Sequence, residues 1–507
     1  MLAKNTMIVM SSIIVCRMTG FLRVILIPHK FGVNRISDAY NIAFLVPDLF
    51  YNLLVGGAIS AALIPILTGY IEKKNEGEGW KVISAFINTS FLAVLLTCIL
   101  GMIFSTDLVK LVASGFLKTS PQDIALTSNL TRILFPSVIF FTFAGIANGV
   151  LNSYHRFAVA SYGPAIYNLF CAASIFIFGS NSEAAVEKVA YGVLFSSIIY
   201  CLFQVTFAIK HVKSYKLKLN LKDPGLINLY KLAFPSLIAS ALVQLNLIIS
   251  TRFITYFSAG NVTAFNMANT VLQFPDGIFI MGMSIAILPT LSAKFATRQI
   301  DECRALLVKS LKIVLLLTVP SMVGLIVLNQ PILRAIYRWS SDFNESSLPI
   351  AGGILIFLSF SLLTQSVVGI ITRGFYADND TKTPLYQGII CLIANFALGY
   401  FLKSSFLGVA GIGLAYSLAS LLRAGLSLEA FRKRINGLGL KSLTMFVMKI
   451  IAASSVMGVA IYYVNQTFLG HPGSKITEVL SLGAQLIIGL CIYFGGVFAL
   501  NKGKLIE

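Results

Sequence analysis

The chain has 507 residues, of which 57% are hydrophobic and only 12% are charged, whereas a soluble globular domain carries roughly 25% charged residues. Lys and Arg total 39 against 20 Asp and Glu, a formal net charge of +19. So apolar a chain offers no polar surface for a nucleic-acid duplex, which excludes nucleic acid as a partner. The basic excess instead fits loops held against an anionic membrane face.

About fourteen apolar runs follow one another along the chain, each near the 20 residues that a membrane helix needs. The sequence therefore predicts an all-α polytopic membrane protein with about fourteen transmembrane helices. The first run carries two arginines and lacks a small-residue cleavage site, which favours a membrane helix over a cleaved signal peptide. The expected helices cover residues 5–27, 38–71, 82–104, 124–151, 159–178, 186–209, 226–257, 262–291, 306–328, 348–371, 385–402, 409–428, 443–464 and 476–500.

The connectors between these runs differ in charge. Residues 210–222, 294–304 and 432–441 are basic, whereas residues 180–187 and 258–261 carry little positive charge. Basic loops tend to stay on the cytoplasmic side of a membrane. We therefore expect both chain termini in the cytoplasm, which agrees with an even number of helices.

Two segments about 225 residues apart look alike, which indicates an internal duplication. The first reads DAYNIAFLVPDLF, residues 38–50, and the second reads TAFNMANTVLQFPDGIF, residues 263–279. Chance similarity between apolar sequences is the alternative. A six-helix duplication predicts two pseudo-symmetric lobes related by an axis along the membrane normal. The predicted domains are an N-lobe of helices 1–6, a C-lobe of helices 7–12 and two additional helices, at residues 1–222, 223–436 and 437–507.

Two arginines lie inside the first expected helix. An ionised side chain at mid-bilayer costs at least a few kcal/mol, so it normally faces a cavity or a partner. Arg17 and Arg23 are six residues apart, which places them about 120° from a common face. Because arginine offers planar, always-charged donors, both are candidate docking groups for a phosphate. For Arg23 the alternative is snorkelling to the headgroups.

A Pro-Asp pair occurs at the matching point of each repeat, first as Pro47 and Asp48, then as Pro275 and Asp276. Proline frees a carbonyl and opens a helix, so both prolines are candidate hinges. Each acid can pair with an arginine or bind a proton or cation for coupling, or it can cap the broken helix. The sequence does not identify a coupling ion.

Other polar and small residues have both a functional and a structural interpretation. Asp38 begins the second expected helix, where the helix dipole alone favours an acid. Gly56 and Gly57 permit bending as a hinge or close helix packing. Arg373 precedes the polar segment GFYADNDTKTP, residues 374–384, for which a gate network and a helix-capping turn are both open.

The sequence shows no motif that is typical of a catalytic site. The seven cysteines lie mostly inside apolar runs and form no CxxC pair, and the four histidines are scattered. No HExxH, P-loop or GxSxG motif occurs. We therefore expect no metal site and no cofactor, and we expect that the protein is not an enzyme.

At these residues the chain resembles the MurJ (MviN) lipid II flippases of the MOP exporter superfamily. The resemblance spans the first twelve expected helices, and its most specific piece is GFYADNDTKTP. The other matching stretches are the Gly20-Phe21 pair between the two arginines, KFG (30–32), DAYNIAF (38–44), GAISAALIPIL (57–67), ILFP (133–136), GVLNSYHRFAVASYGP (149–164), QFP (273–275) and ILPTLS (287–292).

The resemblance implies two six-helix lobes around a central cavity, with the last two helices lining a groove for a polyprenyl tail. It implies alternating-access transport of lipid II, an undecaprenyl-diphosphate-linked peptidoglycan precursor, across the bacterial cytoplasmic (inner) membrane. The cavity arginines and the acid of the family fall on Arg17, Arg23 and Asp38, which are therefore expected to bind substrate. Membrane lipids are expected partners, and cell-wall synthesis proteins stay open as others.

Two positions depart from the family pattern. Tyr51 stands where well-known members carry arginine in the second helix, and Thr270 stands where they carry arginine in the eighth. Asp48 and Asp276 lie nearby, so the resemblance implies a less positive cavity here. A flippase for another polyprenyl-linked oligosaccharide and an ion-coupled small-molecule antiporter of the same superfamily are the alternatives.

Overall fold

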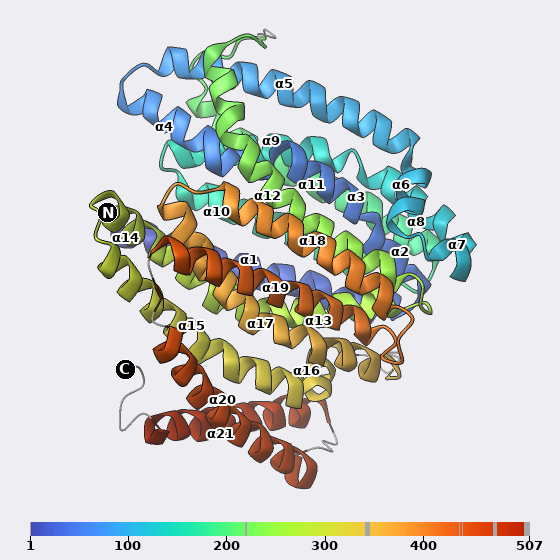
Figure 1. The fold of residues 1–507 in the computed structure, drawn as a ribbon. Helices are drawn as coiled ribbons and strands as arrows, with labels where there is room; N and C mark the ends of the chain where they lie inside the picture. The colour runs from blue at the N-terminus through green and yellow to red at the C-terminus, as the bar shows by residue number, and fades with distance from the viewer. Residues whose placement is uncertain are drawn as a thin grey trace. The chain divides into compact units, whose positions relative to one another are not determined.

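The computed structural model describes residues 2–217, 221–339, 345–435, 437–438, 440–469 and 474–500. Every regular element in these ranges is helical (Figure 1). A helix satisfies its own backbone N–H and C=O groups, which an apolar chain in a bilayer must do because lipid offers no partners. The chain divides into two compact units, Met1–Thr263 and Ala264–Glu507.

Thirteen helical segments of the described chain are long and apolar enough to cross a membrane. A further helix, α1 (Leu2–Phe31), is 30 residues long, and about 20 residues suffice to span the hydrocarbon core. The predicted all-α polytopic membrane protein with about fourteen helices is thereby confirmed. Large apolar side chains on the outside, such as Ile177 and Leu202 at 68% and 60% exposure, suit contact with lipid tails.

In the first unit, α1 packs along α10, which packs against α11, and α11 packs against α9. Two buried apolar clusters join these helices, one around Trp80 and Leu63 and the other around Phe31 and Val189. Besides α1, the helices of this unit are α2 (Arg35–Ala43), α3 (Leu45–Tyr51), α4 (Ile64–Glu72), α5 (Glu76–Ile103), α6 (Ser105–Val112), α7 (Phe116–Thr119), α8 (Pro121–Leu134), α9 (Ser137–Ser153), α10 (Phe157–Phe178), α11 (Glu183–Ala208) and α12 (Pro224–Ile254), with a 3₁₀ turn at Ile209–His211.

The second span begins at Arg35, three residues before Asp38, where the sequence predicts its start. Asn34 caps α2, because its side-chain oxygen accepts from the Ile36 N–H at 2.8 Å. The Ser37 hydroxyl in turn accepts from the Asn34 N–H at 3.1 Å, which completes a capping box. Asp38 therefore lies in the first turn of α2.

The same span is interrupted in its middle. It breaks between α2 and α3, next to Pro47, which has no N–H to donate to the preceding turn. Two π-helical turns follow, η1 (Asn52–Gly56) and η2 (Ile59–Leu63), on either side of Gly57. Because π turns are often found at functional sites, this stretch is a candidate for a functional bend.

The second unit contains an extended buried apolar cluster, with members from Ile280 to Val497. In it, α17 packs against α19 and α15, and α18 packs against α19. The helices are α13 (Asn261–Pro275, which starts at the end of the first unit), α14 (Gly282–Ala296), α15 (Ile300–Val327), α16 (Asn329–Tyr337), α17 (Ser347–Ala377), α18 (Lys382–Leu402), α19 (Ala410–Arg434), α20 (Leu440–Val464) and α21 (Lys475–Leu500), with π turns η4 (Asp276–Met281) and η5 (Asn465–Leu469).

The interruption of the second span recurs in the other half of the sequence. Helix α13 ends at Pro275, and η4 begins at Asp276 before α14 continues. A π turn accompanies the Pro-Asp pair in both segments: η4 starts at Asp276 itself, and η1 starts at Asn52, four residues after Asp48. The predicted lobes, 1–222 and 223–436, and the predicted terminal pair, 437–507, stay predictions.

The last two helices are integral to the core of the second unit. Helices α20 and α21 lie side by side (Figure 1), and α20 also packs against α15. The buried Tyr493 hydroxyl on α21 donates to the Leu316 carbonyl of α15 at 2.6 Å. This bond occupies a polar group that lipid could not satisfy, and it fixes the rotation of α21 about its axis.

Candidate functional site

Arg23 is the charged side chain about which the candidate site of the first unit is built. It is half-buried on α1, the helix that packs along α10. Its guanidinium carbon lies 5.6 Å from the centroid of the Tyr167 ring, within range of a cation–π contact. Its charge also interacts with that of Asp48 on α3. The structure therefore brings together two predicted site residues of opposite charge.

An aromatic cluster surrounds this pair, formed by Tyr51, Phe141, Tyr167 and Tyr200. The ring centroids of Tyr51 and Phe141 are 5.9 Å apart, those of Phe141 and Tyr167 5.0 Å, and those of Tyr167 and Tyr200 6.3 Å. The four rings come from α3, α9, α10 and α11. Such a cluster offers apolar ring faces and phenolic hydroxyls next to one arginine.

Asp48 lies immediately after Pro47, in the first turn of α3. Its carbonyl accepts from the Asn52 side-chain nitrogen at 2.9 Å, at the point where η1 begins. Its carboxylate charge interacts with Arg23 and with Tyr51. The half-buried acid thus lies within electrostatic range of Arg23 in the interrupted span.

Arg17 lies on a different face of α1 from Arg23. Its side chain is exposed, whereas Arg23 is half-buried, as expected for residues about 120° apart around a helix. Both arginines nevertheless interact electrostatically with Cys16, which lies beside Arg17 on α1. Their positive charges are therefore spread along one helix.

Asp38 makes a different set of contacts from the arginines. It is 1% exposed, and its carboxylate accepts from the backbone N–H groups of Gly260 and Thr263, both at 2.7 Å. It also accepts from the Thr263 hydroxyl at 2.7 Å. Asp38 therefore anchors the first turn of α13, where free N–H groups and the helix dipole favour an anion.

The two glycines of the interrupted span have different surroundings. A Cβ at Gly57 would lie 2.5 Å from the backbone carbon and oxygen of Ser236 on α12. A Cβ at Gly56 would instead meet the Asn52 side-chain oxygen at 2.7 Å. Close approach to the backbone of α12 thus requires glycine at 57, while the neighbour of Gly56 is a side chain that can move.

The predicted residues of the second unit surround η4. Half-buried Asp276 begins this π turn directly after Pro275, and its charge interacts with Tyr416 on α19. Arg423 interacts with the same tyrosine. An acid and an arginine of the second unit therefore both lie within electrostatic range of one tyrosine, as Asp48 and Tyr51 interact in the first.

Thr270 and Arg373 have local partners. The Thr270 hydroxyl donates to the Asn266 carbonyl at 2.7 Å, and the Arg373 guanidinium carbon lies 5.8 Å from the centroid of the Tyr376 ring. Neither contact assigns a role in substrate binding or gating, and both roles stay predictions.

The polar segment after α17 contains both a helix cap and an ion-pair network. The Asp380 carboxylate accepts from the N–H groups of Lys382 and Thr383, each at 3.0 Å, which caps α18. Arg434 at the end of α19 donates to Asp380 at 2.8 Å and also pairs with Asp378. Burial alone would raise the pKa of Asp380, but the bonds from Thr383, the charge of Arg434 and the Lys382 N–H together lower it.

Sequence reasoning missed the aromatic cluster. Tyr167 and Tyr200 lie inside apolar runs, where an aromatic residue facing lipid cannot be told from one facing a charge. A signal for this cluster was available in the sequence. The fifth and sixth expected helices each carry a tyrosine, and these tyrosines were candidate partners for the arginines of the first expected helix. In the described ranges, no group of three or more His, Cys, Asp and Glu side chains is placed to hold a metal ion.

Many membrane spans, interrupted helices and charged side chains within those spans are typical of a polytopic membrane transporter. The model of the family described as "Lipid II flippase MurJ" matches residues 27–481. The chain belongs to this family, and it is therefore a multi-pass protein of the bacterial inner membrane.

Individual relatives match over nearly the whole chain. A protein of Vibrio cholerae serotype O1 described as "Probable lipid II flippase MurJ" is 26% identical over 511 residues, covering 97% of this chain and 96% of the relative. A protein of Burkholderia cenocepacia described as "Lipid II flippase MurJ" is 26% identical over 493 residues, with 96% and 95% covered.

Solved structures share the fold. A structure described as "Lipid II flippase MurJ, inward closed conformation" matches with a TM-score of 0.82 at 24% identity, covering 98% of this chain and 99% of that one. An inward-facing multidrug resistance MATE transporter of the MOP superfamily matches with a TM-score of 0.70 at 16% identity, covering 85% of this chain and 96% of the transporter. These likenesses show that the chain shares the fold of these transporters.

Proposed function

We propose that this protein is a lipid II flippase that moves the undecaprenyl-diphosphate-linked peptidoglycan precursor from the inner to the outer leaflet by alternating access. Lipid II is its substrate, surrounding membrane lipids are its partners, and both termini are cytoplasmic. The basic connectors support this orientation, although Lys218 within the first of them lies outside the described residues.

The observation that carries the proposal is the position of Arg23, half-buried in a spanning helix beside Asp48 and the aromatic cluster. A guanidinium among apolar helices is costly unless it has a charged partner. A diphosphate is a better partner than one carboxylate, because it presents several oxygens to a planar fork of donors. Arg17, which is exposed and lies six residues before Arg23 on α1, supplies a second positive group for the same substrate.

The chemistry of docking is an exchange of counter-ions. The diphosphate accepts hydrogen bonds from Arg23 and displaces Asp48, while the sugars lie against the faces of Tyr51 and Tyr167. The displaced carboxylate is then free to take up a proton or a cation, which couples substrate binding to ion binding. Asp38 acts apart from this exchange by holding the start of α13.

Movement between the two open states uses the interrupted spans. Helix α3 and the π turns after it bend at Pro47, Gly56 and Gly57, and the second unit bends at Pro275. A membrane potential that is negative inside favours outward movement of an anionic headgroup, by about 2.3 kcal/mol per charge per 100 mV. The headgroup crosses while its tail stays in lipid.

The test is complementation of a strain depleted of its own lipid II flippase, combined with export of labelled lipid II. Arg23→Ala and Arg17→Ala should abolish both, while the protein stays in the membrane at the wild-type level. Arg432→Ala, at an exposed ion pair on α19, is the matched control and should retain both. Growth and export at the wild-type level in Arg23→Ala would overturn the docking role.

Tyr51 and Thr270 favour one alternative substrate. If family members use arginine there for part of the lipid II headgroup, their absence fits a flippase for another polyprenyl-linked oligosaccharide. Both substrates carry the diphosphate, so Arg23 is needed for either one. Export assays with lipid II and with a polyprenyl-diphosphate glycan lacking the pentapeptide distinguish them, and Tyr51→Arg should improve lipid II export alone.

A further inference from the structure

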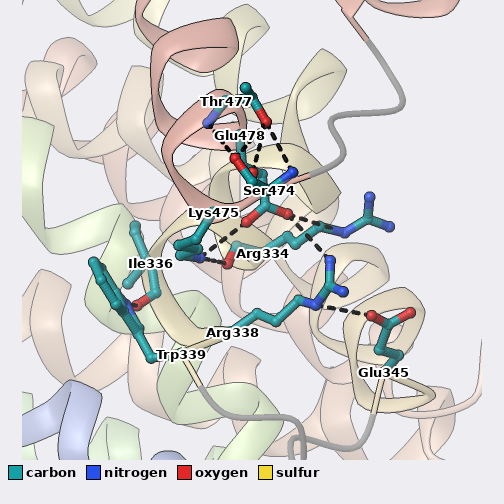
Figure 2. Close-up of polar contacts among 9 residues, drawn as sticks. All are labelled: Arg334, Ile336, Arg338, Trp339, Glu345, Ser474, Lys475, Thr477 and Glu478. Atoms are coloured by element: carbon teal, nitrogen blue, oxygen red, sulfur yellow. Dashed lines mark hydrogen bonds and ion pairs between the residues drawn. The ribbon is translucent and has the colours of Figure 1, made fainter.

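A second cluster of charges lies in the second unit, away from the bends of the spans. It comprises Arg334 and Arg338 on and just after α16, together with Lys475 and Glu478 in the first turn of α21 (Figure 2). Helix α16 packs against α21. We call these four residues the α16–α21 cluster. It lies at the start of the spanning helix α21 and on α16, which follows α15 in the chain and precedes α17.

Glu478 is the buried centre of this cluster, with a side chain only 6% exposed. Lys475 reaches it at 3.0 Å and also donates to the Arg334 carbonyl at 2.7 Å. The two arginines stay further away, because Arg334 Nε and Arg338 Nη1 lie 3.8 Å and 3.5 Å from Glu478 Oε1. Among the described residues, that oxygen and Arg334 Nε have no hydrogen-bond partner.

The cluster carries more positive than negative charge. Three cations face two carboxylates in the described chain, Glu478 and the half-exposed Glu345, which Arg338 meets at 2.9 Å. Figure 2 shows the terminal nitrogens of Arg334 directed away from Glu478. Guanidinium donors that are held near an acid by charge, without bonding to it, are available to a second anion.

The surroundings place this cluster at the level of lipid headgroups. Trp339 is 57% exposed, and its ring centroid lies 4.9 Å from Lys475 Nζ. Exposed tryptophan next to basic residues is typical of the membrane–water interface. Ile476 and Leu480, exposed by 74% and 66%, continue from Lys475 along one face of α21. A phosphate at the cluster therefore has an apolar path for its acyl chains directly beside it.

We propose that Arg334, Arg338 and Lys475 bind the phosphate of an anionic membrane lipid, which joins α16 to the start of α21. Ser474 and Thr477 support this arrangement by fixing the first turn of α21: the Thr477 hydroxyl accepts from the Ser474 N–H at 2.9 Å, and the Ser474 hydroxyl accepts from the Thr477 N–H at 3.3 Å. The lipid stays bound and is distinct from any transported substrate.

The test measures binding of phosphatidylglycerol to the delipidated full-length protein by native mass spectrometry. Arg334→Gln and Arg338→Gln should each weaken binding by about fivefold, the effect expected for one basic residue near an anionic surface. Arg432→Gln is the matched control and should bind as the wild type does. Equal binding by all four proteins would overturn the proposal.

Glu478→Gln separates a lipid site from a purely structural ion-pair cluster. Removing the central carboxylate leaves the cations without their acid, so a lipid site should bind phosphatidylglycerol more tightly, by about fivefold or more. If the cations serve only to neutralise Glu478, its loss should leave lipid binding unchanged or weaker, and that result overturns the proposal. Size-exclusion chromatography in detergent confirms that each variant is folded before it is measured.

A third arm distinguishes a lipid from a free phosphate. Phosphatidylglycerol should raise the midpoint of thermal unfolding of the wild-type protein, while inorganic phosphate at the same concentration should leave it unchanged. Equal stabilisation by inorganic phosphate would show that acyl chains do not contribute and would overturn the assignment to a lipid.

Discussion

The Asp38 carboxylate holds Thr263 at two points, accepting from its backbone N–H and from its hydroxyl, each at 2.7 Å. A third bond comes from the Gly260 N–H. Hydrogen bonds to an ionised, buried acceptor are roughly twice as strong as neutral ones. The first turn of α13 is therefore secured by one acid on α2.

Asp38→Asn should lower the stability of the purified protein by roughly 1–3 kcal/mol, because the amide keeps one acceptor oxygen but loses the charge that strengthens these bonds. Thr263→Val removes only the hydroxyl and should cost about 1 kcal/mol. The midpoint of thermal unfolding in detergent measures both effects. Wild-type midpoints in both variants would mean that these bonds contribute nothing to stability.

Arg23 and Asp48 should behave as a coupled pair in a double-mutant cycle. Arg23→Gln removes the positive charge that interacts with the Asp48 carboxylate among apolar helices, so it should lower the stability of the protein. The double variant with Asp48→Asn should be more stable than Arg23→Gln alone. Unfolding midpoints of the four proteins measure the coupling, and strictly additive effects would contradict the pairing. The exposed Arg432 and Glu429 pair supplies a control cycle with coupling near zero.

Gly57→Ala and Gly56→Ala form a matched test of the close approach to α12. The Cβ at position 57 would overlap backbone atoms of Ser236, so the helices must separate and both stability and transport should fall. At position 56 the Asn52 side chain can rotate away, and we expect little change in stability. Thermal unfolding and complementation measure the two effects. Equal tolerance of both substitutions would exclude a packing role for Gly57.

The stability contributed by Asp380 should depend on pH. Its pKa is lower in the folded protein than the unfolded value of about 3.9, so the contribution is complete above the unfolded pKa and is lost as pH falls through the folded one. The difference in unfolding midpoint between the wild type and Asp380→Asn should be constant from about pH 6 to 8 and shrink below about pH 4. A difference that grows on acidification would reverse the assigned sign.

The positions of the spans could be predicted from the sequence because lipid imposes a minimum length of apolar helix. The run expected at 159–178 is observed as Phe157–Phe178. The bend at Pro275 was also predictable, since proline removes one N–H from any helix. These features depend on local chemistry alone.

Side-chain partners could not be predicted in the same way. The contact between Arg23 and Tyr167 depends on how α1 rotates against α10, and apolar faces of similar composition do not fix that rotation. The anchoring of α13 by Asp38 depends on a meeting of residues far apart in the sequence, for which the short Asp38 segment gives no signal. The cluster of Arg334 and Arg338 around the buried Glu478 likewise depends on how α16 packs against α21.

The π turn of η4 contains one residue more than the α-helical turn that it replaces. If the same residues, Asp276–Met281, were wound as an ordinary α-helix, every later side chain of α14 would be turned by about 100° relative to α13. Ile287 and Leu291, now buried, would then leave the protein interior. The one extra residue of η4 thus decides which face of α14 contacts lipid.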